Sequence, residues 1–220
     1  MPRIARGLAG GATYHILNRG NGRQEVFHKE RDYKAFIDLM TKAKERYLIK
    51  IFAYCLMPNH FHIVLMPREA EDLSRYMHWL MSSHVRRYHR HYGSSGHIWQ
   101  GRYRSFIIQE DGHLLTVLKY VETNPNRAGL VKSPKEWLWS SHKDRMNGKY
   151  SLLDKPPLSL PDDWAGHADT PLLDKELKNI RKSVNRQSPY GLLPWQIEVS
   201  RNLGLESTLR PIGRPKKNEQ

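Results

Sequence analysis

Apolar and polar positions in the first two thirds of the chain follow two periods, and each change of period marks an expected element. Alternating or unbroken apolar runs predict four strands, at 13–18, 49–56, 60–66 and 106–109. Apolar residues at helical spacing predict helices over 31–46, 73–91 and 111–124. In the third helix Asp111 is expected to act as the cap, and Pro125 is expected to end it.

The order of these elements predicts the fold class. Strands and helices alternate as β-α-β-β-α-β-α, with the short segment 57–59 as a tight turn between the second and third strands. This order is typical of an α+β ferredoxin-like sandwich, in which an antiparallel central sheet is covered by helices. The helix over 111–124 is then an additional element that follows the last strand.

The amino-acid composition of the chain changes near residue 150. Eight of the thirteen prolines follow this point, which disfavours a regular core until helical patterns return over 173–184 and 194–204. We therefore predict one compact domain over residues 1–149. Residues 150–220 form a Pro-rich and basic C-terminal extension with short helices.

Two histidines and a tyrosine are the candidates for chemistry. In an extended strand His60 and His62 lie on one face and can present two imidazoles to one metal ion. At about 100° per residue, Tyr120 and Asn124 lie about 40° apart on a helix, which suits a nucleophile and a third metal ligand. Each part alone is common without any function, so the prediction depends on their combination: a tyrosine nucleophile assisted by a metal.

Charge points to a nucleic-acid partner. The chain has 36 Lys and Arg against 22 Asp and Glu, a formal net charge of +14. Cationic and aromatic residues interleave over 84–92 and again at 102–104, and we expect four of these residues to contact DNA, namely Arg86, Arg87, Arg102 and Arg104. Tyr88 and Tyr92 fit base stacking and helix packing equally well. A basic surface that is merely solvated is the alternative for the charge as a whole.

The remaining composition narrows the class of protein. A single cysteine, Cys55, excludes an internal disulfide, and its apolar strand pattern predicts a buried structural thiol. No apolar stretch is long enough for a signal peptide or a membrane span. We expect a soluble cytoplasmic protein.

Two longer strings resemble a known family. Ala53 to Val64 and Tyr120 to Val131 are similar to the two signature blocks of the single-tyrosine HUH transposases, and the most similar branch is that of the REP-associated tyrosine transposases. Shorter stretches at 14–20, 99–103 and 137–141 also resemble that branch. The likeness covers about residues 8 to 145, and the segment 203–217 resembles the basic tail of the branch.

The resemblance implies a fold, a reaction and a set of site residues. The fold would be the same sandwich; His60 and His62 would bind a divalent metal, Mg²⁺ or Mn²⁺; Tyr120 would be the nucleophile. Asn124 would occupy the position of the third ligand, where many relatives carry Gln. The implied reaction cleaves single-stranded DNA at hairpins of repetitive extragenic palindromes and leaves a 5′-phosphotyrosine and a free 3′-hydroxyl. Imidazole ligands suit Mn²⁺ at least as well as Mg²⁺.

Further DNA contacts are expected from the same stretches. Arg19 and Arg127 lie within the similar strings, and Arg214 and Lys216 belong to a Gly-Arg-Pro tail of the kind that enters a minor groove. A disordered solubilising tail is the alternative for the last two. The partner would be single-stranded or hairpin DNA, and the protein could act as a monomer or a homodimer.

Three other functions compete with this interpretation. A DNA-binding regulator could keep the fold without cutting, but intact His60, His62 and Tyr120 count against it. A replication initiator or relaxase of the broader HUH group usually has a longer histidine cluster. Metal hydrolases also use His-x-His, but Met66, Pro67 and Arg68 stand where the lactamase-like hydrolases need an aspartate and a histidine.

Overall fold

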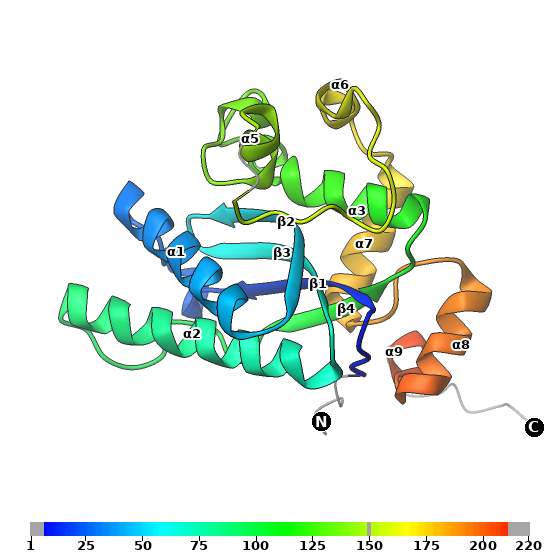
Figure 1. Cartoon of the computed structure of the whole chain (residues 1–220), viewed down its shortest axis with the longest axis horizontal. Coiled ribbons are helices and arrows are strands. Elements are labelled where there is room, and N and C mark those ends of the chain that lie inside the picture. The colour runs from blue at the N-terminus through cyan, green and yellow to red at the C-terminus, as the bar shows by residue number, and fades with distance from the viewer. Residues whose placement is uncertain (1–6, 149–150, 211–220) are drawn as a thin grey trace, which may run out of the picture.

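A four-stranded sheet with the strand order β2-β3-β1-β4 forms the centre of the molecule (Figure 1). The structure is a computed structural model that describes residues 7–148 and 151–210. Its strands are β1 (Thr13–Arg19), β2 (Ile49–Met57), β3 (His60–Pro67) and β4 (Arg104–Ile108). Every neighbouring pair is antiparallel. The predicted mixed fold with an antiparallel central sheet is confirmed.

Helices cover both faces of this sheet. The long helices α1 (Glu30–Arg46) and α2 (Ala70–Tyr92) lie on one face, and α3 (Gly112–Glu122), which follows β4, lies on the other (Figure 1). On β3, Phe61 and Ile63 belong to the core under α1 and α2, whereas Val64 belongs to the core under α3. Because side chains alternate along a strand, His60 and His62 lie on the same face as Val64 and α3.

The helix that carries Tyr120 differs from its prediction at its C-terminal end. Asp111 caps it as expected, since its side chain accepts a hydrogen bond of 2.8 Å from the backbone N–H of His113. The helix stops at Glu122, however, and a separate short helix, α4 (Asn124–Arg127), follows with Pro125 in its first turn. The helix ends before Pro125, as expected, but two residues earlier than the predicted Asn124. Proline lacks an N–H, which a first helical turn does not use, so Pro125 fits the first turn of α4.

The C-terminal part of the chain packs onto the sheet layers. Its two longer helices, α7 (Asp174–Arg186) and α8 (Leu193–Leu203), have 13 and 11 residues and lie where the pattern predicted helices. The shorter elements after α4 are the 3₁₀ turn η2 (Pro134–Glu136), α5 (Ser141–Met146), α6 (Trp164–Asp169) and α9 (Glu206–Leu209). Leu152 and Leu153 join the core under α1 and α2, and Trp164, Ile180 and Tyr190 join the core under α3. The domain boundary between residues 149 and 150 stays a prediction. In packing, the later segment shares both cores.

Three smaller features bear on the predictions. Cys55 is fully buried, as expected, and burial raises the pKa of its thiol, so it stays protonated. Tyr88 and Tyr92 pack against each other with ring centroids 4.7 Å apart, and the Tyr92 hydroxyl donates to Asp32 at 2.5 Å. Helix packing therefore accounts for both tyrosines. In the part of the chain that the structure describes, no helix is long and apolar enough to cross a bilayer.

Candidate catalytic site

The two predicted metal ligands lie side by side on β3. The ring centroids of His60 and His62 are 5.0 Å apart, and the two rings are nearly perpendicular. Burial, and secondarily the charge of Arg19, lowers the pKa of His60 to about 4. Burial, with the two neighbouring histidines, holds the pKa of His62 well below its ordinary value. Both imidazoles are therefore neutral near pH 7, which is the state that can bind a metal ion.

Hydrogen bonds leave the same nitrogen free on both rings. The Nδ1 atom of His60 lies 2.6 Å from Oδ1 of Asn59, whose amide nitrogen is already used in a bond to the carbonyl of Arg23. An amide oxygen only accepts, so His60 carries its proton on Nδ1 and keeps a lone pair on Nε2. The Nδ1 atom of His62 is also engaged, at 2.8 Å from Nε2 of His15. Such partnered Nδ1 atoms are the usual second layer of a metal site.

His15 is the residue of this site that the sequence analysis missed. It lies on β1, is fully buried, and stacks on His62 with ring centroids 5.0 Å apart. Burial lowers the pKa of His15 to about 3, so this imidazole is neutral as well. Its Nδ1 has no partner among the described residues. We assign the proton of the shared bond to His62 Nδ1, which leaves Nε2 of His62 open for a metal.

Tyr120 reaches the same face of the sheet from α3. Its ring centroid is 5.8 Å from that of His62 and 6.2 Å from that of His15, in edge-on contacts. The side chain is 8% exposed, so only a small part of it is open to solvent. Two strands and the helix thus bring the predicted nucleophile to the predicted ligands.

Arg127 is bound to the segment that carries Tyr120. Its Cζ lies 4.2 Å from the centroid of the Tyr120 ring, and its Nη2 donates to the Tyr120 carbonyl at 2.8 Å. Nη1 donates to Oγ1 of Thr123 at 2.6 Å. The sequence predicted a DNA contact for Arg127. Here its guanidinium fixes the position of Tyr120 across the break between α3 and α4.

Asn124 has a different environment from the one its helical spacing implied. It is the first residue of α4 and is half-buried. Within the described residues its side chain makes no hydrogen bond, which leaves its amide oxygen available. Those residues also contain no group of three or more His, Cys, Asp or Glu that could hold a metal ion. Any metal site here therefore consists of two imidazoles completed by an amide oxygen or water.

A buried carboxylate fixes the C-terminal end of α3. Glu122 is fully buried, and it accepts hydrogen bonds from four side chains of the segments that follow, namely Ser141 at 2.5 Å, His142 at 3.3 Å, Arg145 at 2.9 Å and Trp164 at 2.6 Å. Burial alone would raise the pKa of Glu122, but these partners hold it below its ordinary value. The carboxylate therefore joins α3, α5 and α6 just beyond Tyr120.

Four of the predicted DNA-binding cations lie on the two opposite faces of the sheet, two on each face. Arg19 and Arg104 lie on the face of the active site, since their register partners are His60 and Leu17. Arg86 and Arg102 line a groove on the opposite face, beside α2.

Arg87 is less available for a DNA contact, because other residues of the protein already bind its guanidinium. Arg87 forms an ion pair of 3.4 Å with the buried Asp32 and also donates to the carbonyl of Arg31. Its DNA contact stays a prediction. Arg214 and Lys216 lie outside the described residues.

Comparisons with known proteins show the family to which the chain belongs. Residues 10–124 match the family described as "Transposase IS200 like". A REP-associated tyrosine transposase of Escherichia coli K12 is 25% identical over 161 residues, which cover 72% of this chain and 87% of that protein. A candidate REP-associated tyrosine transposase of Haemophilus influenzae is 28% identical over 137 residues, which cover 57% of this chain and 72% of that protein.

A solved structure supports the fold separately. A REP-associated tyrosine transposase bound to a REP hairpin superposes with a TM-score of 0.55, at 21% identity, over 79% of this chain and 100% of that one. The family match extends from before His15 to Asn124 and so includes β1, β3 and the Tyr120 helix. The chain therefore belongs to the IS200-like transposases, an enzyme family, and REP-associated tyrosine transposases are among its relatives.

Proposed function

We propose that the protein is a metal-dependent single-strand DNA endonuclease and strand transferase that acts on hairpins of repetitive extragenic palindromes. One observation carries the proposal: Tyr120 contacts His62 on the sheet face that also carries His60, and both imidazoles have their Nδ1 atoms occupied and their Nε2 atoms free. A nucleophile beside two neutral nitrogen ligands is the minimum that metal-assisted phosphoryl transfer requires.

The donor set fits a divalent metal. Two neutral imidazoles with the Asn124 amide would hold it, and water would complete its coordination. Mn²⁺ and Mg²⁺ are both compatible with this set, with nitrogen ligands favouring Mn²⁺. A metal bound there would neutralise charge on the phosphate as it is attacked.

The residues of the chain supply the remaining steps. The Tyr120 oxygen attacks phosphorus and loses its proton, a bond to the 5′-phosphate forms, and the bond to the 3′-oxygen breaks as that oxygen takes up a proton. The covalent ester keeps the energy of the broken bond, so the strand can be rejoined or transferred without ATP. Arg127 and Glu122 hold the nucleophile in place, and His15 orients His62.

The partner is hairpin DNA with an unpaired segment at its foot. Three findings support this: the net charge of +14, the exposed Arg102 and Arg104, and the relative whose structure is bound to a REP hairpin. Only an unpaired strand offers a flexible phosphate to a largely buried tyrosine, while a stem is recognised by shape and backbone. We place this reaction on chromosomal DNA in the cytoplasm, with one or two copies of the chain at work.

A covalent adduct tests the proposal. End-labelled hairpin DNA with unpaired flanks is incubated with Mn²⁺ and the protein, and the products are separated on a denaturing gel. The wild type should yield a labelled protein-DNA adduct that chelator and Tyr120→Phe both abolish. Tyr120→Phe should still bind the hairpin, because only the hydroxyl is removed. Binding without an adduct in the wild type would instead favour a non-cutting regulator.

A further inference from the structure

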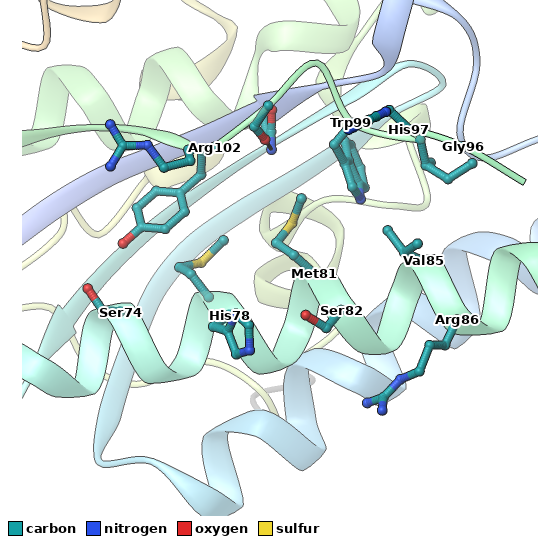
Figure 2. Close-up of a pocket in the computed structure, with 15 residues that line it drawn as sticks. Ser74, His78, Met81, Ser82, Val85, Arg86, Gly96, His97, Trp99 and Arg102 are labelled. Carbon is teal, nitrogen blue, oxygen red and sulfur yellow. Dashed lines mark hydrogen bonds between the residues drawn. The ribbon is translucent and has the colours of Figure 1, made fainter. Parts of the chain in front are cut away.

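A groove runs along α2 on the face of the sheet opposite Tyr120. It has a volume of about 710 Å³, within the range of pockets that hold small organic ligands. Figure 2 shows α2 along one side, with Ser74, His78, Ser82 and Arg86 on it, and the segment from Gly96 to Arg102 along the other side.

The floor and the rim of this groove differ in character. Met81 and Val85 of α2 and the ring of Trp99 provide an apolar floor (Figure 2). Two arginines at the rim, Arg86 and Arg102, are exposed. Both side chains point outward from the rim in Figure 2. An apolar floor with cations at its rim is a composition that accommodates unpaired bases together with their phosphates.

The charge of the lining points to an anionic occupant. None of the described residues that line this groove is an Asp or a Glu, whereas two exposed arginines, Arg86 and Arg102, line it. A second groove, between α3 and the C-terminal helices, is lined by Asp111 and Glu176 together with Lys175 and Lys182, so its charges balance. A polyanion would therefore be attracted to the α2 groove more than to the other.

The groove is connected to the active site through two consecutive residues of β1. Asn18 lines the groove and donates a hydrogen bond of 3.0 Å to the carbonyl of Gly101. Arg19, the next residue, points to the other face, where it pairs in register with His60. Single-stranded DNA that passes over this end of the sheet would reach both the groove and the catalytic site within a few nucleotides.

We propose that this groove binds the unpaired nucleotides at the foot of the hairpin, with bases on the Met81, Val85 and Trp99 floor and phosphates against Arg86 and Arg102. The proposal rests on the proposed function and adds the part of the substrate that this face recognises. The stem is bound elsewhere. Stacking of one base contributes enough to change affinity by about tenfold or more.

Two variants and one matched control test it. Val85→Trp fills the groove, and Arg102→Glu reverses a rim charge in an exposed loop; Arg75→Glu makes the same charge change at an exposed position of α2 outside the groove. Each is combined with Tyr120→Phe so that no DNA is cut. Affinities are measured by fluorescence anisotropy for a blunt hairpin, a hairpin with an unpaired tail, and the tailed hairpin with abasic sites in the tail.

The groove variants should weaken binding of the tailed hairpin by about tenfold and leave the blunt hairpin within about twofold. Abasic sites should weaken wild-type binding to a similar degree and cause no further loss in Val85→Trp. Arg75→Glu should change the affinity for the blunt hairpin and for the tailed hairpin to the same extent. Equal losses on blunt and tailed DNA, or no loss at all, would overturn the proposal. The adduct assay uses the same groove variants in a chain that keeps Tyr120. An adduct formed by these variants, together with normal tail binding, would remove only the groove assignment and leave the proposed function intact.

Discussion

The Nε2 atom of His15 lies 2.8 Å from the Nδ1 atom of His62, in a fully buried contact between two neighbouring strands. If His15 fixes the tautomer of His62, removing its acceptor should weaken the metal site. We expect His15→Phe to lower Mn²⁺ affinity by about 10- to 100-fold, whereas His15→Gln, which keeps an acceptor, should retain more of it. Calorimetric titration of Mn²⁺ without DNA measures this directly.

A histidine far from the site provides the control. His91→Phe changes an exposed residue of α2 and should leave Mn²⁺ affinity unchanged. Equal Mn²⁺ affinity in the wild type and His15→Phe would show that His15 serves packing alone.

The Glu122 cluster should be essential for stability. Glu122→Gln removes a buried charge that faces Arg145, whose side chain is only 7% exposed. Breaking a buried ion pair from one side costs about 3 kcal/mol or more, because the remaining charge loses its partner. Urea unfolding should show this loss. Glu71→Gln, at an exposed position of α2, should change stability by less than about 0.5 kcal/mol.

A double variant distinguishes the loss of the ion pair between Glu122 and Arg145 from general damage to the core. The double variant Glu122→Gln with Arg145→Met should recover part of the lost stability, because no unpaired charge remains. A double variant less stable than Glu122→Gln would contradict the assignment.

His84 makes folding stability depend on pH. It is buried among aromatic rings, and burial lowers its pKa from 6.5 to about 3. Below pH 6.5 the unfolded chain binds a proton that the folded chain does not take up until about pH 3, so this contribution to stability is lost as pH falls. The expected slope is at most about 1.4 kcal/mol per pH unit for this residue.

The test compares unfolding free energies from pH 7 to 5, above the ordinary range of carboxyl groups. His84→Phe should give a shallower decline than the wild type. The other buried histidines are present in both proteins and cancel in the difference. Parallel pH profiles would mean that His84 is not held neutral.

The basic tail can be tested without disturbing the core. A truncation after residue 149 would also remove Leu152, Leu153 and Trp164, which are buried, so loss of activity would be uninformative. Deleting residues 211–220 removes three cations, Arg214, Lys216 and Lys217, and keeps all of the described residues. We expect weaker hairpin binding and a shallower salt dependence, with the slope reduced by about one unit for each phosphate that the tail would otherwise neutralise.

Replacing Arg214, Lys216 and Lys217 by Gln in the full chain should have the same effect as the deletion. Unchanged affinity and salt slope in both variants would show that the tail is not a DNA arm.

The local pattern was sufficient to predict most of the fold. Alternation placed Phe61 and Ile63 in one layer and the two histidines in the other, and the cap at Asp111 marked the start of the tyrosine helix. These features depend on neighbouring residues only. The end of that helix was predicted two residues too late, because Pro125 is compatible with either a stop or a new first turn.

The parts of the site that the sequence analysis did not predict depend on contacts between residues far apart in the chain. His15 meets His62 only in the register that aligns β1 with β3, and no local pattern determines that register. A polar residue in the middle of the apolar strand at 13–18 was the available signal, since a buried imidazole needs a partner. The partners of Glu122 likewise come from segments after the catalytic helix, so its role could not be read from the surrounding residues.

Identifying the attachment point of the DNA tests the central claim most directly. The adduct formed with Mn²⁺ is digested with protease and nuclease, and the modified peptide is sequenced by mass spectrometry. The account predicts a single nucleotide linked through its 5′-phosphate to Tyr120. Linkage to another residue, or through a 3′-phosphate, would contradict it.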